Sequence, residues 1–265
     1  MDGKQLRMNR LFAEDKKMVM IPMDHGITLG PIRGIENIDQ AVAAIDQAAV
    51  DSFVLHKGMV KSISQSPKAS LIVHLSASTE LGPQPLRKVQ VCTVEEALRL
   101  GADAVSTHIN FGSEYEAEQI VDTAEVAEAC DRWGMPLLVM AYVRGENIDA
   151  ADVKKTAHAV RIAAELGADI VKTSFPENAE SMHEIVSATS LPTLVAGGGK
   201  VDDALNLFRM IEKAIQAGCA GVSIGRNVFS HRYPREIAQQ LVRIVHHSVG
   251  AESAYEALTK VFENA

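Results

Sequence analysis

Lys172 stands where a surface lysine is not expected, directly after the apolar pair Ile170-Val171. Burial and nearby cations disfavour the ammonium form of such a lysine, and the neutral amine that remains can attack a carbonyl group and form a Schiff base. A strand-end lysine that reaches water or pairs with a carboxylate is the competing interpretation. Its position makes Lys172 the first candidate nucleophile of the chain.

Two further residues at the ends of apolar runs have the chemistry to move protons. Tyr142 closes the run at residues 136–142, and Asp24 follows Pro22-Met23. A carboxylate beside a buried strand is costly without a partner, which favours a paired or catalytic role for Asp24. Tyr142 is a candidate acid, and an aromatic ring that only closes the mouth of a pocket is the alternative.

Two glycine-rich turns late in the chain predict an anion site. The first is the run of three glycines at residues 197–199, and the second contains Gly225 and Arg226. Glycine-rich turns present backbone N–H groups to phosphate, and an arginine can hold phosphate in bidentate fashion. Three glycines alone would be a weak signal, because any turn that needs a positive φ attracts them. The pair of turns favours a phosphate ligand.

Histidines on the early strands raise the question of a metal centre. The candidates are His25, His56, His74 and His108. No pair of ligands stands one residue apart on the first strand, and H-E-x-x-H does not occur. We therefore expect no metal, and we interpret these histidines as buried or substrate-binding groups, with His25 and His108 as possible substrate contacts. Lys57 is a third possible contact, although solvation also explains it.

The elements that position these residues follow a repeated pattern. A helix end followed at once by an apolar strand occurs at residues 49–54, 101–105, 167–171 and 218–222. Glycine in these junctions suits the left-handed residue after a helix, and the apolar run after it suits a strand buried on both faces. Further apolar runs lie between the copies, at residues 18–23, 70–75, 136–142 and 192–196. The chain therefore predicts eight strands.

Amphipathic stretches separate most of these strands, and they predict helices at residues 37–48, 93–100, 114–133, 149–166, 178–189 and 202–217. Eight βα units in 265 residues predict an α/β fold, a single (β/α)8 TIM barrel spanning residues 1–265. A helix at residues 3–12 precedes the first strand, and extra helices at residues 236–246 and 252–262 close the chain. A doubly wound sheet is the alternative, but its phosphate loop normally follows the first strand.

Composition limits the function classes. Hydrophobic residues make up 47% of the chain, and 26 basic against 34 acidic residues give a net charge of −8. This balance argues against broad binding to nucleic acid or anionic membranes, but a local anion site remains compatible with it. The three cysteines lack the spacing of a zinc site or a disulfide framework, and the opening segment lacks an apolar core. We expect a cytoplasmic protein.

The strand-end motifs resemble the archaeal-type class I aldolase family over nearly the whole chain. The motifs are PMDHG (residues 22–26), GPI (30–32), VLHKG (54–58), HLSAST (74–79) and VCTVEEA (91–97). The family includes fructose-bisphosphate aldolases and 2-amino-3,7-dideoxy-D-threo-hept-6-ulosonate synthases. The aldolase branch typically has Glu-His where this chain has Thr28-Leu29, so the resemblance is closer to the synthase branch.

The resemblance implies roles for individual residues. Lys172 would be the Schiff-base lysine, Tyr142 the proton donor and Asp24 the proton acceptor. The phosphorylated sugar would be held by a group of residues in three turns: Tyr142, Val143, Arg144, Gly197, Gly198, Gly225 and Arg226. Val143 departs from the proline that is usual in the family, which removes a constraint on φ. The resemblance implies neither metal nor cofactor.

The reaction implied by the resemblance is a transaldol transfer of a three-carbon ketone fragment. The donor would be 6-deoxy-5-ketofructose 1-phosphate and the acceptor L-aspartate 4-semialdehyde, in an alternative route to 3-dehydroquinate and aromatic amino acids. A large, ring-based homo-oligomer is also implied. Three alternatives remain: a fructose-bisphosphate aldolase using the same lysine, a metal-dependent barrel enzyme built on His25, His56 and His108, and a non-catalytic barrel that binds phosphorylated sugars.

Overall fold

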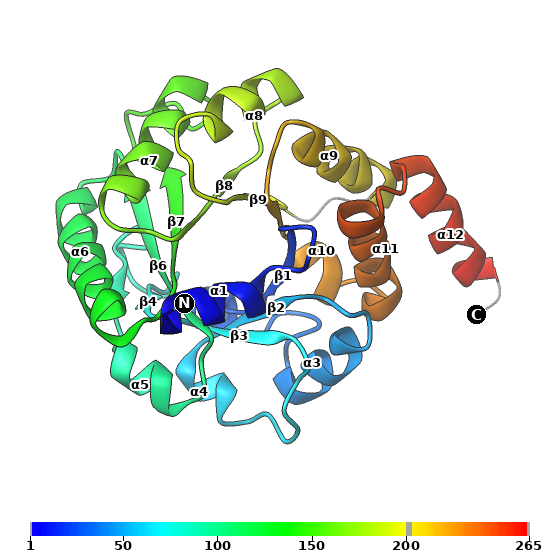
Figure 1. Ribbon diagram of the computed structural model, residues 1–265, viewed down its shortest axis with the longest axis horizontal. Helices are drawn as coiled ribbons and strands as arrows, with labels where there is room; N and C mark the ends of the chain where they lie inside the picture. The colour runs from blue at the N-terminus through cyan, green and yellow to red at the C-terminus, as the bar shows by residue number, and fades with distance from the viewer. Residues whose placement is uncertain (1, 200–202, 264–265) are drawn as a thin grey trace.

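The computed structural model describes residues 2–199 and 203–263, and within these ranges eight parallel strands close into a barrel (Figure 1). Their order around the barrel is β1-β10-β9-β8-β7-β6-β3-β2. The strands are β1 (Met18–Pro22), β2 (Ser52–Leu55), β3 (Ser70–His74), β6 (Ala104–Phe111), β7 (Leu137–Val143), β8 (Ile170–Ser174), β9 (Thr193–Ala196) and β10 (Gly221–Ser223). The predicted (β/α)8 fold is confirmed.

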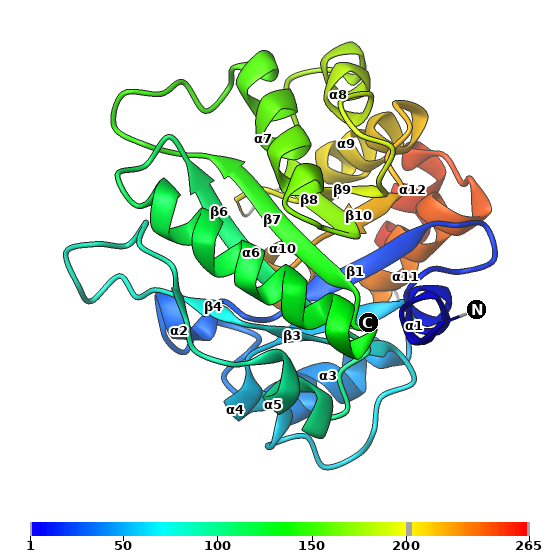
Figure 2. The same cartoon turned by 60° about the vertical axis from the view of Figure 1, so that its left-hand side comes forward.

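Helices cover the outside of the barrel, and in Figure 2 α6 lies over β6 and β7. The helices are α1 (Gly3–Leu11), α2 (Gly26–Leu29), α3 (Ile38–Asp46), α4 (Lys57–Val60), α5 (Val94–Arg99), α6 (Glu116–Trp133), α7 (Val153–Glu165), α8 (Ala179–Val186), α9 (Ala204–Gln216), α10 (Arg226–Phe229), α11 (Pro234–His247) and α12 (Ala251–Glu263). The long helices match the predictions. For the helix predicted at 202–217, residue 202 lies outside the described residues. None of the helices in the described ranges has the length and apolar character needed to cross a bilayer.

Three short helices and one small hairpin of the described chain were not predicted. The short helices α2, α4 and α10 each follow a barrel strand, and a small antiparallel hairpin of β4 (Ser76–Ala77) and β5 (Val89–Gln90) follows β3. Each is too short to produce a recognisable hydrophobic period. Because each follows a barrel strand, these elements belong to the loops at the carboxyl ends of the strands, where barrel enzymes place their sites.

The repeated helix-to-strand junctions have a structural basis that goes beyond glycine. Gly101, Gly167 and Gly218 have φ values of 82°, 97° and 98°, as predicted for residues that follow helix ends. The aspartates of the junctions add a second function, because the carboxylate of Asp169 accepts a hydrogen bond from Leu137 N at 2.8 Å. Asp51 and Asp103 bind the backbones of the strands before them in the same way. These carboxylates fix the relative position of neighbouring strands.

Side chains alternate strictly between the two faces of the barrel wall. In β7, Leu138, Met140 and Tyr142 belong to the cluster inside the barrel, while Val139 and Val143 pack outward against the helices. The fully buried Leu11 of α1 belongs to this interior cluster. Figure 1 shows α1 lying across one opening of the barrel. The polar residues at the carboxyl ends therefore stand on an apolar floor.

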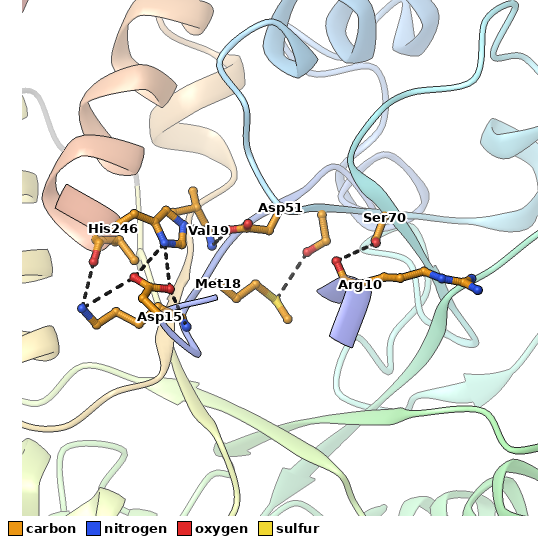
Figure 3. Close-up of polar contacts among 10 residues, drawn as sticks. Arg10, Asp15, Met18, Val19, Asp51, Ser70 and His246 are labelled. Carbon is orange, nitrogen blue, oxygen red and sulfur yellow. Dashed lines mark hydrogen bonds and ion pairs between the residues drawn. The ribbon is translucent and has the colours of Figure 1, made fainter. Parts of the chain in front are cut away.

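A polar clamp ties α11 to the amino-terminal side of β1 (Figure 3). His246 bonds through Nδ1 to Asp15 at 3.0 Å and through Nε2 to Asp51 at 2.9 Å, and Asp51 also accepts from Val19 N. Burial lowers the pKa of His246, but the two carboxylates outweigh it and raise the pKa above its ordinary value. The protonated imidazole therefore bridges two acidic residues.

Candidate active site

A pocket of about 370 Å³ opens at the carboxyl ends of the barrel strands. Most of the predicted site residues line it: Asp24, His25, His108, Tyr142, Arg144, Lys172, Gly197, Gly198, Gly225 and Arg226. They come from β1, β6, β7, β8, β9 and β10 or from the turns that follow these strands. The barrel thus brings together residues that are up to about 200 positions apart in the sequence.

Lys172 lies inside the pocket and is only 6% exposed. In the barrel register it stands between Met140 of β7 and Leu194 of β9. Because Ile170 of the same strand points into the interior cluster, the period of two places Lys172 on the inner face above it. The side chain therefore projects into the cavity, where a ligand can reach its amine.

Asp24 provides the negative charge of the pocket. Its carboxylate lies 3.6 Å from His25 Nδ1 and 3.9 Å from His74 Nε2. Burial raises the pKa of Asp24, but the electrostatic interactions of its carboxylate with His74, His25 and Lys172 outweigh burial and hold the pKa well below its usual value. Burial also lowers the pKa of His74 to about 3, so at neutral pH His74 is uncharged. Asp24 is then an ionised base beside Lys172.

Tyr142 is held on the strand next to Lys172. It lies two residues beyond Met140, which is the register partner of Lys172. Its ring packs against His108, with centroids 5.1 Å apart, and the Arg144 guanidinium lies 4.4 Å from its centre. These contacts fix the direction of the phenol, and the ring is 7% exposed. The arrangement gives the pocket an oriented O–H donor.

His74 and His108 are neutral, hydrogen-bonded groups. His74 Nδ1 is bonded to Ser106 Oγ at 2.8 Å, and His108 Nε2 donates to Asn110 Oδ1 at 2.9 Å. Burial lowers the pKa of His25 and His56 and holds that of His108 well below the usual value. Within residues 2–199 and 203–263, no group of three or more His, Cys, Asp or Glu residues is arranged to hold a metal ion.

The two glycine turns meet at one end of the pocket. Arg226 Nη2 donates to the carbonyl oxygen of Gly198 at 3.0 Å, which ties the second turn to the first. Gly198 has a φ of 66°. A Cβ at Gly225 would lie 2.6 Å from the Pro22 carbonyl oxygen, and one at Gly197 would lie 2.8 Å from Ile224 Cδ1. Only glycine allows these close approaches of the two turns to the neighbouring strand ends.

Two predicted contacts point away from the pocket. Lys57 follows Leu55 on the outward face of β2 and pairs with Glu96 at 3.0 Å. Val143 lies on the outward face of β7, in the core between barrel and helices. Neither side chain lines the pocket. For Val143 the reason is the alternation of strand residues, since Val143 directly follows the inward-facing Tyr142. Lys57 lies beyond the end of β2 and is the first residue of α4.

Sequence reasoning missed several residues that do line the pocket. Lys88 and Glu80 come from the segment between β4 and β5, and Ser223 comes from β10. Ser223 Oγ is buried without a hydrogen-bond partner among the described residues, as are the Nδ1 atoms of His25 and His56. Ser223 could have been found from strand alternation. The segment around Lys88 has no period that predicts an inward direction.

Comparisons with known proteins agree with this geometry. The profile of the DeoC/LacD family of aldolases matches residues 18–231. The chain is 44% identical over 250 residues to 2-amino-4,5-dihydroxy-6-oxo-7-(phosphonooxy)heptanoate synthase of Streptomyces griseus, covering 93% of this chain and 91% of that protein. It is 42% identical over 253 residues to 2-amino-3,7-dideoxy-D-threo-hept-6-ulosonate synthase of Halobacterium salinarum, covering 95% of both.

A solved structure of a Schiff-base-forming fructose-1,6-bisphosphate aldolase superimposes with a TM-score of 0.86 at 28% identity. The match covers 92% of this chain and all of that one. The sequence matches and the shared barrel point to the same group of enzymes. This protein belongs to the DeoC/LacD family of aldolases.

Proposed function

We propose that this protein is a transaldolase that uses Lys172 as a Schiff base and makes 2-amino-3,7-dideoxy-D-threo-hept-6-ulosonate. The donor is 6-deoxy-5-ketofructose 1-phosphate, and the acceptor is L-aspartate 4-semialdehyde. The observation that carries the proposal is a buried lysine that projects into a pocket between an ionised Asp24 and an oriented Tyr142. These are the groups that imine chemistry needs.

The products named for the two relatives support the choice of acceptor. Both are seven-carbon 2-amino acids with a ketone at C6. An aldol bond joins the carbon next to a ketone to the carbon that carries the new hydroxyl, which here means C5 and C4. Breaking this bond leaves a four-carbon amino-acid aldehyde and a three-carbon ketone. The two relatives thus share an acceptor and differ in whether the ketone fragment keeps a phosphate.

The mechanism needs an acceptor for the electron pair of the breaking bond. The neutral amine of Lys172 adds to the donor ketone and forms a carbinolamine. The carbinolamine then loses its hydroxyl as water, with a proton donated by Tyr142, and becomes a protonated imine. When the carbon–carbon bond breaks, its electron pair enters the imine and forms an enamine. Asp24 takes the proton of the adjacent hydroxyl, and an aldehyde departs.

The second half of the cycle runs in reverse on the new aldehyde. The enamine carbon attacks the aldehyde of L-aspartate 4-semialdehyde, and Asp24 returns its proton to the new hydroxyl. Water then adds to the imine, Tyr142 regains its proton, and Lys172 is released. Arg226 and the turns at Gly197, Gly198 and Gly225 hold the phosphate of the donor. Binding energy remote from the reacting bond positions the ketone.

Other properties follow the same proposal. Residues 1–265 would act as one domain in the cytoplasm, as a homo-oligomer, in a route to aromatic amino acids. The acidic net charge of −8 and the small pocket support a metabolite as the ligand, as opposed to nucleic acid. No cofactor takes part in the proposed cycle.

Borohydride trapping tests the proposal. The protein is mixed with the proposed donor and reduced with borohydride, and its peptides are mapped by mass. We expect a donor-dependent adduct on the peptide that contains Lys172 and none in Lys172→Ala. The matched control is Lys57→Ala, because Lys57 also follows a barrel strand but faces outward. An adduct on another lysine, or none with any phosphorylated ketose, would overturn the proposal.

Substrate assays separate the remaining alternatives. Consumption of L-aspartate 4-semialdehyde supports the synthase, whereas rapid cleavage of fructose bisphosphate without that acceptor supports an aldolase. Dihydroxyacetone phosphate should be included as a donor, because the product named for the Streptomyces relative retains a phosphate. Full activity after exhaustive chelation would exclude a metal-dependent enzyme. Binding without turnover of any candidate would indicate a non-catalytic barrel.

A further inference from the structure

Lys88 lies on the side of the pocket opposite the glycine turns. The turns follow β9 and β10, whereas Lys88 lies in the segment between β3 and β6. In the order around the barrel, β3 is four strands from β9 and β6 is four strands from β10, which is half of the ring. A ligand phosphate at the turns therefore leaves the Lys88 side of the pocket to another part of the substrates.

The position of Lys88 is fixed by its own segment. Its Nζ donates to Ser78 Oγ at 2.5 Å, and Ser78 Oγ donates to the Pro85 carbonyl oxygen at 2.8 Å. Thr28 Oγ1 in turn donates to the Ser78 carbonyl oxygen at 3.0 Å, which joins the segment to α2. The ammonium group is thus held by a hydrogen bond to the Ser78 hydroxyl, and that hydroxyl is itself held by the backbone.

The ammonium group of Lys88 has no anionic partner in the described part of the chain. It forms no ion pair there, and its hydrogen bond to Ser78 goes to a neutral hydroxyl. Burial, followed by the charge of Arg144, lowers the pKa of Lys88 to about 8, while Asp24 and Glu80 act in the opposite direction. A largely buried cation without an anionic partner is stabilised by a ligand anion that binds to it.

We propose that Lys88 and Arg144 bind the carboxylate of an amino-acid aldehyde, and that Glu80 binds its ammonium group. This inference rests on the proposed function and extends it to the acceptor, for which no recognition residue was predicted. The proposed acceptor carries its two charges at the end remote from the aldehyde. The aldehyde can then point towards Lys172 while the charged end occupies the side of Lys88.

The mixture of charges favours an amino acid over a second phosphate. Lys88, Arg144 and Glu80 line the same pocket, and the carboxylate of Glu80 is close enough to act on the charge of Lys88. A phosphate dianion would be repelled by Glu80, whereas a zwitterion offers one charge to each sign. The chemistry of this side therefore matches an amino-acid backbone.

Calorimetric binding of L-2-aminobutyrate tests the inference without turnover. This amino acid has the four-carbon skeleton of the acceptor and lacks the aldehyde. We expect Lys88→Met to weaken its binding about tenfold to hundredfold, the usual cost of a lost charge-assisted bond. Lys88→Arg should keep most of the affinity. Glu80→Gln should abolish the preference for L-2-aminobutyrate over butyrate. Arg87→Met is the matched control, because the neighbouring Arg87 pairs with Glu118 outside the pocket.

Kinetics give the second readout. Lys88→Met should raise KM for L-aspartate 4-semialdehyde by a similar factor, leave KM for butanal unchanged, and leave donor-dependent trapping on Lys172 intact. Equal binding of L-2-aminobutyrate to the wild type and Lys88→Met, or no measurable binding to the wild type, overturns the inference. A Lys88→Met variant that loses affinity for fructose bisphosphate but keeps its affinity for L-2-aminobutyrate also overturns the inference. Loss of the Lys172 adduct in the wild type would instead overturn the proposed function.

Discussion

Replacing Tyr142 with phenylalanine removes one oxygen from the pocket and nothing else. The ring is 7% exposed, packs against His108 with centroids 5.1 Å apart, and lies 4.4 Å from the Arg144 guanidinium. These contacts belong to the ring and persist in Tyr142→Phe, so the free energy of unfolding should change by less than about 1 kcal/mol. What disappears is the proposed proton donor for dehydration of the carbinolamine.

The expected kinetic cost is that of a general acid. Loss of a positioned acid typically slows a step by about 10² to 10⁴. We expect kcat for transfer to fall by that factor, while the Kd of the donor stays within about threefold, because phosphate recognition lies with Arg226 and the glycine turns. The adduct on Lys172 should still form, but its rate of appearance in rapid-quench borohydride experiments should fall in parallel with kcat.

The matched control is Tyr115→Phe, since Tyr115 lies beneath Arg87 outside the pocket and should show no kinetic change. A Tyr142→Phe variant that keeps more than a tenth of wild-type kcat would refute the role assigned to the phenol. So would a variant whose adduct appears at the wild-type rate, because the slow step would then lie after imine formation.

Three further predictions concern the framework of the site. Gly225→Ala should lower the free energy of unfolding by about 1 to 3 kcal/mol and raise KM for the phosphorylated donor, because the new Cβ would lie 2.6 Å from a β1 carbonyl oxygen. Gly58→Ala is the control, because a Cβ at Gly58 has free space. Equal melting temperatures of the two variants would contradict this prediction. Leu11→Ala should cost about 2 to 5 kcal/mol in urea unfolding, against little for the half-exposed Leu6→Ala on the same helix. His246→Gln should cost about 1 to 3 kcal/mol near pH 6. Because the pKa of His246 is raised in the folded protein, the contribution of His246 to the free energy of unfolding is complete below about pH 6.5 and declines as pH rises through the raised pKa. A stability loss in His246→Gln that does not depend on pH would contradict the clamp.

The strands and the centre of the site were predictable because both depend on short-range patterns. Apolar runs with glycine or a small residue before them identified the barrel strands, and the period of two then determines which side chains face inward. The same rule, applied throughout, places the side chain of Val143 on the outward face of β7. The rule would also have added Ser223, which lies at the end of the last strand, two residues before Gly225.

The direction of a loop side chain does not follow from such patterns. Lys88 stands in a segment whose course depends on hydrogen bonds from Thr28 and Ser78 and on the hairpin of β4 with β5. These contacts link residues up to 50 positions apart, and they follow no repeat in the sequence. A charged residue after a turn is normally solvated, so the inward direction of Lys88 emerges only from the fold.

The layered interior explains why the chemistry is confined to one level of the barrel. Below the pocket, Met20, Val54 and Ile72 fill the interior and exclude water. The carboxylate of Asp24 lies above this floor and is screened by solvent on one side only, so it interacts with neighbouring groups more strongly than it would on the surface. Asp24 and Lys172 come from the ends of strands, and in the proposed cycle neither can be replaced without loss of the reaction. The loops that carry Lys88 and Glu80 are under no such constraint, and acceptor choice is therefore expected to depend on them.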